Sequence, residues 1–104
     1  MTPIIVNSLD AARAALAGGE RALTSPHAAA CHAGVSYYRA MLQQLRNEFP
    51  TIDFAFTLCC GADAAMAHDA LRLGFLSVRC DCSDVVFAEL QSLANSLGAQ
   101  MFRP

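Results

Sequence analysis

The sequence of 104 residues contains no lysine, and all seven of its basic residues are arginines. The chain therefore has no amine for Schiff-base chemistry with a carbonyl substrate and no lysine for a phosphate-binding loop. Acidic residues outnumber the arginines by nine to seven, and the arginines are scattered along the chain. A nucleic-acid-binding protein would instead carry a basic stripe, so we expect no nucleic-acid partner.

The sequence also lacks long apolar runs and the features of a secretory leader. Every apolar stretch is broken by Asp, Arg, Gly or Pro well before the roughly 18 residues of a membrane span. The first residues have no basic region, and the five cysteines are an odd number. We therefore expect no membrane partner and a cytoplasmic location with free thiols. Many Ala and Arg without Lys are typical of a GC-rich bacterial genome.

Apolar residues make up 55% of the chain, which is enough for one core without disulfides. We expect a single α/β domain over residues 1–104. The most informative stretch is residues 52–58, where apolar side chains alternate at the two-residue period of a strand and the intervening residues are also apolar or small. A strand apolar on both faces is typical of the inside of a sheet.

Strand and helix patterns alternate along the rest of the chain. Strands are expected at residues 3–6, 21–25, 52–58, 75–80 and 99–102, and helices at residues 9–17, 35–49, 63–73 and 83–97. Residues 26–34 are expected to form a loop with one helical turn. This order predicts a mostly parallel five-stranded sheet with helices on both faces, a three-layer flavodoxin-like arrangement. The alternative is a half (βα)8-barrel, which would leave one face of the sheet bare. We expect a homo-oligomer in either case.

A short phrase occurs twice: a strand, a small polar cap, Asp-Ala-Ala, Ala-Leu, Gly and another strand. It begins at Val6 and reaches Gly18, and begins again at Cys60 and reaches Gly74. The phrase resembles the βα unit of (βα)8-barrels of the aldolase and phosphate-binding kinds. The resemblance covers about half of the chain and implies a βα fold. The chain is well short of the ~250 residues of a full barrel, so the resemblance assigns no catalytic residue.

The carboxyl ends of parallel strands meet at one edge of a sheet, here called the rim, and all five cysteines fall there. Thiolates and imidazoles are ligands that zinc or another thiophilic metal prefers. The metal-ligand candidates are Cys31, His32, Cys59, Cys60, Cys80 and Cys82. None of the spacings is the C-x-x-C of a zinc ribbon. The alternative is that no metal binds and that the cysteines fill the core as small apolar residues.

Two other kinds of site are predicted at the same rim. Cys31 is a candidate nucleophile, with His27 or His32 as its base. Backbone N–H groups at the start of a helix and a nearby arginine could instead hold a small anionic ligand. The residues for that ligand are Cys59, Cys60, Gly61, Arg79 and Asp81. The alternative for the arginine is a surface ion pair with Asp81 or Asp53.

These patterns favour a small bacterial protein that binds a ligand or assembles through the rim of its sheet. The alternative is a metal-binding protein or an enzyme that uses a cysteine and a histidine at the same place. The sequence leaves open whether the chain is an enzyme.

Overall fold

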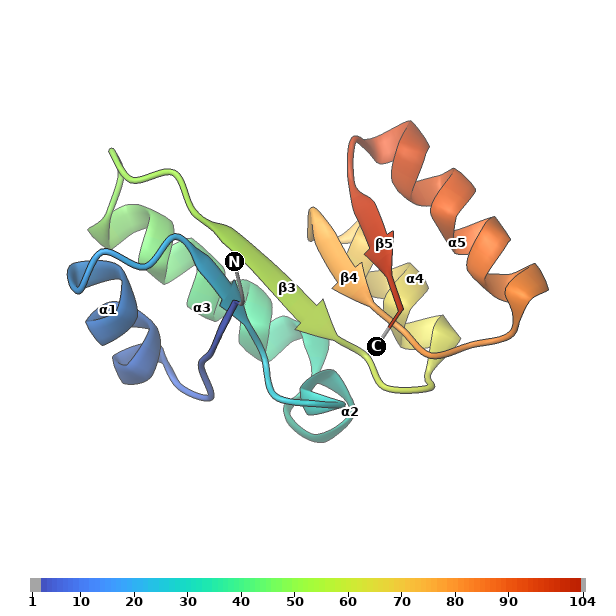
Figure 1. Cartoon of the computed structure of the whole chain (residues 1–104), viewed down its shortest axis with the longest axis horizontal. Coiled ribbons are helices and arrows are strands. Elements are labelled where there is room, and N and C mark those ends of the chain that lie inside the picture. The colour runs from blue at the N-terminus through green and yellow to red at the C-terminus, as the bar shows by residue number, and fades with distance from the viewer. Residues whose placement is uncertain (1–2, 104) are drawn as a thin grey trace.

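The computed structural model describes residues 3–103, which form strands and helices in alternation (Figure 1). The strands are β1 (Ile4–Ile5), β2 (Ala22–Thr24), β3 (Ala55–Cys59), β4 (Ser77–Arg79) and β5 (Gln100–Phe102). The helices are α1 (Leu9–Ala17), α2 (Ala29–Ala33), α3 (Val35–Glu48), α4 (Ala64–Arg72) and α5 (Asp84–Leu97). Helix α2 is the one helical turn expected in the loop after β2.

The five strands form one sheet in which neighbouring strands are parallel and follow the order of the chain, β1-β2-β3-β4-β5. The predicted α/β class and the five-stranded parallel sheet are confirmed. All strands point the same way, so their carboxyl ends share one rim, as the placement of the predicted sites requires.

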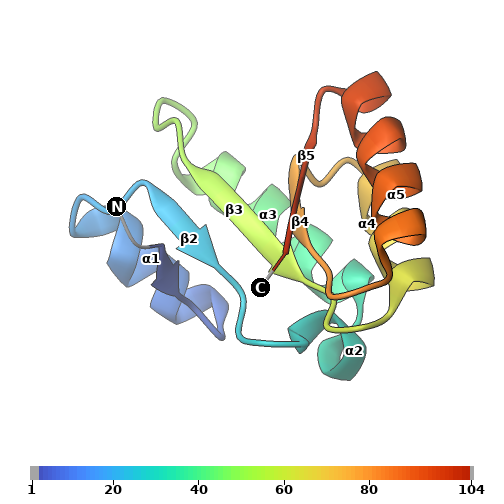
Figure 2. The ribbon, with the colours of Figure 1, turned by 45° about the vertical axis from the view of Figure 1, so that its right-hand side comes forward.

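The four longer helices form a single layer. Helix α1 contacts α3, α3 contacts α4, and α4 contacts α5. Figures 1 and 2 show this row of helices on the outer side of the curved sheet. Right-handed crossovers between strands in sequential order place every helix on the same face. Helices on both faces would need the strand order to reverse. The arrangement is therefore that of the half-barrel alternative, with one sheet face left without helices.

Helix starts follow the capping residues in the sequence. The side chains of Ser8, Asp63 and Ser83 each accept a hydrogen bond from the backbone N–H three residues later, at 3.1, 3.0 and 3.3 Å. Each cap satisfies one N–H group that the first turn leaves free. At the other end of α5, Gly98 adopts the left-handed conformation that ends the helix.

The core lies between the helix layer and the covered face of the sheet. Alternate strand residues point into it, and each of them is at most 6% exposed: Leu23, Phe56, Leu58, Val78 and Met101. Leu16, Leu45 and Leu71 pack against them from α1, α3 and α4, and each is at most 1% exposed. Burial of each such side chain stabilises the fold by about 1.5–3 kcal/mol relative to exposure. Within residues 3–103, no helix has both the length and the apolar composition to cross a membrane.

One strand begins later than the pattern predicts. Residues 52–54 were expected in β3, but the N–H of Ile52 donates to the carbonyl of Phe49 at 3.1 Å and closes a turn after α3. Pairing with β2 therefore begins at Ala55, opposite Ala22.

Candidate functional site

The rim gathers sulfur groups from three parts of the chain. Cys59 and Cys60 leave the end of β3, Cys80 leaves the end of β4, and Cys31 lies on α2. The Cys31 thiol donates to the carbonyl of Cys60 at 3.2 Å, which joins α2 to the end of β3. The Cys82 thiol lies near enough to Cys80 to raise the pKa of the Cys80 thiol, after the larger effect of burial. The cysteines therefore lie together at one edge, as the parallel topology predicts.

The two innermost thiols are neutral. Cys60 and Cys80 are both fully buried. Burial, with smaller contributions from the neighbouring thiols and Asp63, raises the pKa of each thiol to about 12. A thiol with such a pKa is not a nucleophile at neutral pH, because attack requires the thiolate. This environment fits the core-packing alternative for Cys60 and Cys80.

Cys59 fixes the loop that follows β2. Its sulfur accepts a hydrogen bond from the N–H of Ala28 at 3.2 Å and lies 3.9 Å from Nδ1 of His27. Its own N–H donates to the hydroxyl of Ser25 at 2.8 Å. The contact between a cysteine and a histidine at the rim is thus made by Cys59 and His27. Cys59 is 1% exposed, so this thiol is shielded from a substrate.

The predicted nucleophile is not hydrogen-bonded to either of its predicted bases within the described residues. Cys31, His27 and His32 are all exposed. Within the described part of the chain, Cys31 makes no hydrogen bond to either histidine and bonds the backbone of Cys60 instead. The geometry supplies no base for Cys31.

Gly61 brings two loops close together. Its φ is +58°, in the left-handed region, and its carbonyl accepts a hydrogen bond from the N–H of Asp81 at 2.7 Å. A Cβ on Gly61 would lie 2.9 Å from the Cβ of Ala28. Gly61 and Asp81, both predicted ligand-binding residues, therefore hold the rim loops in place.

The predicted metal ligands lie near one another but do not form a ligand set. Over residues 3–103, no group of three or more His, Cys, Asp or Glu side chains is arranged to hold a metal ion. Cys59 and Cys60 are adjacent residues at a strand end and turn to opposite faces, as strand alternation requires. His32 and Cys31 are on the exposed side of α2.

Arg79, a predicted ligand-binding residue, has a side-chain nitrogen that needs a hydrogen-bond partner. It is half-buried, and its Nε atom is buried without a hydrogen-bond partner within the described residues. The alternative of an ion pair with Asp81 or Asp53 is not among the salt bridges of residues 3–103. Arg79 is two residues after Ser77 on β4, so both side chains point to the sheet face without helices.

That face, here called the uncovered face, carries a row of uncharged residues that are polar except for Ile5 at the edge. The strand register aligns Ile5 with Thr24 and Thr57, and it aligns Ser77 with Gln100. The contact between the Thr57 and Ser77 hydroxyls connects the two parts of the row. The hydroxyl of Thr24 donates to the carbonyl of Thr57 at 3.2 Å, and the hydroxyls of Thr57 and Ser77 lie 2.7 Å apart. Apart from Arg79 on the next row, these positions bear no charge.

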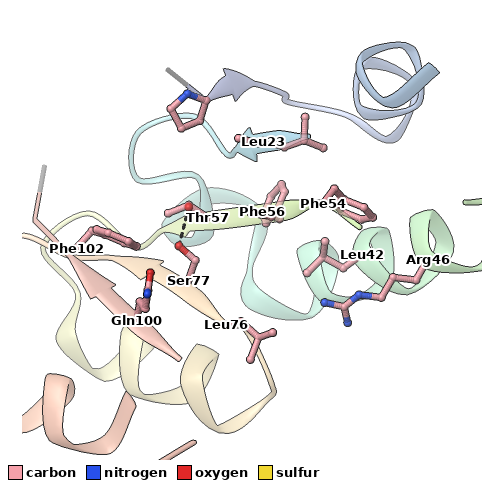
Figure 3. Close-up of a pocket in the computed structure, with 13 residues that line it drawn as sticks. Leu23, Leu42, Arg46, Phe54, Phe56, Thr57, Leu76, Ser77, Gln100 and Phe102 are labelled. Atoms are coloured by element: carbon pink, nitrogen blue, oxygen red, sulfur yellow. Dashed lines mark hydrogen bonds between the residues drawn. The ribbon is translucent and has the colours of Figure 1, made fainter. Parts of the chain in front are cut away.

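The sheet opens between β3 and β4. β3 pairs with β2 through Ala55–Thr57 but pairs with β4 only through Leu58 and Cys59. A cavity of about 320 Å³ lies in this opening, on the side of the uncovered face (Figure 3). Its walls come from β2, β3, β4, β5 and α3 and from Pro3, Phe54 and Leu76 just before strands. Among the described residues of the lining, Arg46 is the one that carries a charge.

The sequence does not predict this opening, because strand alternation shows which residues share a face but not how far two strands stay paired. The signal that was present is the run of small residues at Ala55, Thr57 and Ser77.

Comparisons with protein-family models, curated proteins and solved structures find no match to this chain.

Proposed function

We propose that this protein is an assembly module, a half-barrel unit that forms a homodimer by covering its bare sheet face with a second copy of the chain. The observation that carries the proposal is the five-stranded parallel sheet with helices on one face only. All-parallel sheets occur almost only where both faces are covered.

The composition of the uncovered face supports contact with another protein surface. Apolar side chains lie exposed on or beside it: Ile5 is 67% exposed, Leu76 is 57% exposed and Phe102 is 41% exposed. The positions between them are small, as at Ala55, which is exposed, and Thr57, which is half-buried. Small uncharged residues allow a second sheet to approach closely, and each Å² of apolar surface removed from water contributes about 25 cal/mol.

A second copy is the occupant that the strand edges favour. β1 and β5 are both edge strands, and both are short, parallel and exposed. An unpaired edge offers free N–H and C=O groups for another strand. Pairing of β5 with β1 of the second copy would continue the strand order without reversing direction. In a dimer with two-fold symmetry, β5 of each copy would pair with β1 of the other copy, and the two bare sheet faces would cover each other.

The experiment compares two glutamate substitutions by sedimentation equilibrium. Ala55→Glu places a carboxylate on the uncovered face, where the side chain is exposed in the single chain. Ala14→Glu is the matched control on the outer side of α1, also exposed. We expect the unchanged chain and Ala14→Glu to be dimers and Ala55→Glu to dissociate at least tenfold more readily, with unchanged circular dichroism. Equal masses for all three proteins, or a monomeric unchanged chain, would refute the proposal.

Binding of a small anion at the rim is a second candidate function, favoured by the buried Nε of Arg79 that lacks a partner. Titration with inorganic phosphate, followed by amide chemical shifts, tests it. We expect shifts at Arg79 and its neighbours that disappear in Arg79→Gln and persist in Arg72→Gln, an exposed arginine on α4. Shifts that survive Arg79→Gln would remove this candidate.

A further inference from the structure

We propose that the cavity between β3 and β4 binds a small carboxylate with an apolar body. This site does not depend on the proposed dimer, because it is argued from the residues that line the cavity and from their charge.

The walls of the cavity are largely apolar. Side chains from β3, β4, β5 and α3 surround it, including Phe54, Phe56, Leu42, Leu76 and Phe102 (Figure 3). The volume of about 320 Å³ lies at the lower end of the range for small-molecule sites. At about 30 Å³ for each water-sized group, it has room for roughly ten such groups. A ligand of this size matches a medium-chain fatty acid or a simple aromatic acid.

The positive charge in the cavity lining favours an anionic ligand. Among residues 3–103, Arg46 is the single charged residue of the lining, and no carboxylate side chain of these residues lines the cavity. Within residues 3–103, Arg46 makes no ion pair and no side-chain hydrogen bond. A guanidinium group at the edge of an apolar cavity is suited to a carboxylate, which it can bind through two parallel N–H groups. An alcohol of the same length would lack this interaction.

The fold explains how a helix side chain reaches a cavity on the far side of the sheet. Leu42 and Arg46 are four residues apart on α3, so they lie on one helix face, one turn from each other. The missing pairing between β3 and β4 leaves the sheet open at that level. Figure 3 shows both side chains directed to the opening from below, beside Phe54. The apolar side chain and the charged one thus form the floor of the cavity.

The experiment uses octanoate and octan-1-ol as matched probes on the isotope-labelled chain, followed by amide chemical shifts. We expect octanoate to shift residues around Phe54 and Leu76 and to bind at least tenfold more tightly than octan-1-ol. Arg46→Gln should weaken octanoate binding at least tenfold, whereas Arg72→Gln should leave it unchanged. Equal binding of the two probes, shifts elsewhere on the molecule, or full affinity in Arg46→Gln would overturn the inference.

Sedimentation in the presence of octanoate separates this inference from the assembly proposal. Ala55, Leu76 and Phe102 line the cavity and also belong to the face that the second copy would cover. We therefore expect octanoate to lie beneath the second copy, with its carboxylate at Arg46, and not to lower the mass of the dimer. If octanoate competed with self-association, the partner chain would fill the cavity and the ligand site would be refuted while the dimer stood. If the chain were monomeric but octanoate bound as described, assembly alone would fail.

Discussion

The hydroxyl groups of Thr57 and Ser77 lie 2.7 Å apart and connect β3 to β4 across the uncovered face of the sheet. This contact lies just beyond the end of the backbone pairing, which joins these two strands only at Leu58 and Cys59. A side-chain hydrogen bond thus connects the two strands where their backbone pairing has ended.

Loss of this hydrogen bond should loosen the junction between the two strands. Each of Thr57→Val and Ser77→Ala should lower the free energy of unfolding by about 0.5–1.5 kcal/mol. Because both substitutions break the same contact, the double variant should lose less than the sum of the two. Urea denaturation measures all three values, and Ser92→Ala, an exposed position on α5, is the control. Strictly additive losses would show that the two hydroxyls do not interact.

Gly61 is predicted to be required for two separate reasons. A non-glycine residue at a φ of +58° costs about 1–2 kcal/mol, and the added Cβ would lie 2.9 Å from the Cβ of Ala28. Gly61→Ala should therefore destabilise the protein by about 2–4 kcal/mol. Gly98 has a φ of +71° and open space around it, so Gly98→Ala should destabilise the protein only by the cost of the left-handed backbone conformation. Thermal unfolding of both variants checks this, and equal losses would rule out the close approach.

The five thiols should react with Ellman's reagent at widely different rates. Cys31 is exposed and Cys82 is half-buried, whereas Cys59, Cys60 and Cys80 are buried. We expect one fast thiol, one slower thiol and three that react only as the protein unfolds. Stopped-flow absorbance with and without urea measures the rates. A Cys31 thiol reacting far faster than a free cysteine would instead favour the enzyme alternative.

The buried thiols should make the protein sensitive to alkali. Burial raises the pKa of Cys60 from its ordinary value of 9.0 to about 12. Above pH 9 the unfolded chain therefore loses this proton before the folded chain does. Stability should fall from pH 9 to pH 12, by at most about 1.4 kcal/mol per pH unit for each such thiol.

Cys60→Ala should show a shallower alkaline decline, and Cys31→Ala, at an exposed thiol, should follow the unchanged protein. Burial also raises the pKa of Tyr38, which adds the same slope to all three proteins. Urea midpoints at a series of pH values measure the effect. Identical slopes for the two cysteine variants would contradict the assigned environment of Cys60.

The helix layer should be sensitive to acid through Glu48. Arg13 on α1 donates to this carboxylate at 2.6 Å and Gln44 donates at 2.7 Å, so the pKa of Glu48 falls from 4.5 to about 2. The unfolded chain binds a proton below pH 4.5 that the folded chain does not bind until pH 2. The stabilisation is thus present above pH 4.5 and disappears by pH 2.

Glu48→Gln tests this contribution. The variant should be less stable than the unchanged chain at pH 7, and the difference in urea midpoint should vanish as the pH approaches 2. Glu89→Gln, at an exposed carboxylate without an ion pair in residues 3–103, is the control. A Glu48→Gln difference that persists unchanged at pH 2 would show that the charge of Glu48 is not its cause.

Local patterns in the sequence predict the elements and the rim, because the strand period and the caps at Ser8 and Ser83 act over a few residues. The distribution of the helices is not local: it depends on which strands become neighbours. Ala55 and Thr57 are small enough for a face that helices cover and for a face that meets another chain, so they do not distinguish the two arrangements. The sequence also does not show which cysteine His27 contacts, because the path of the loop after β2 decides whether its imidazole lies beside Cys31 or Cys59.

The central claim is that the uncovered face of the half-barrel is covered by a second copy of the chain. An equal mixture of isotope-labelled and unlabelled protein, examined by isotope-filtered nuclear Overhauser spectroscopy, tests it directly. The account predicts contacts between copies at the methyl groups of Ala55 and Thr57 and at the ring of Phe102. Contacts confined to the helices, or none between copies at millimolar concentration, would contradict it.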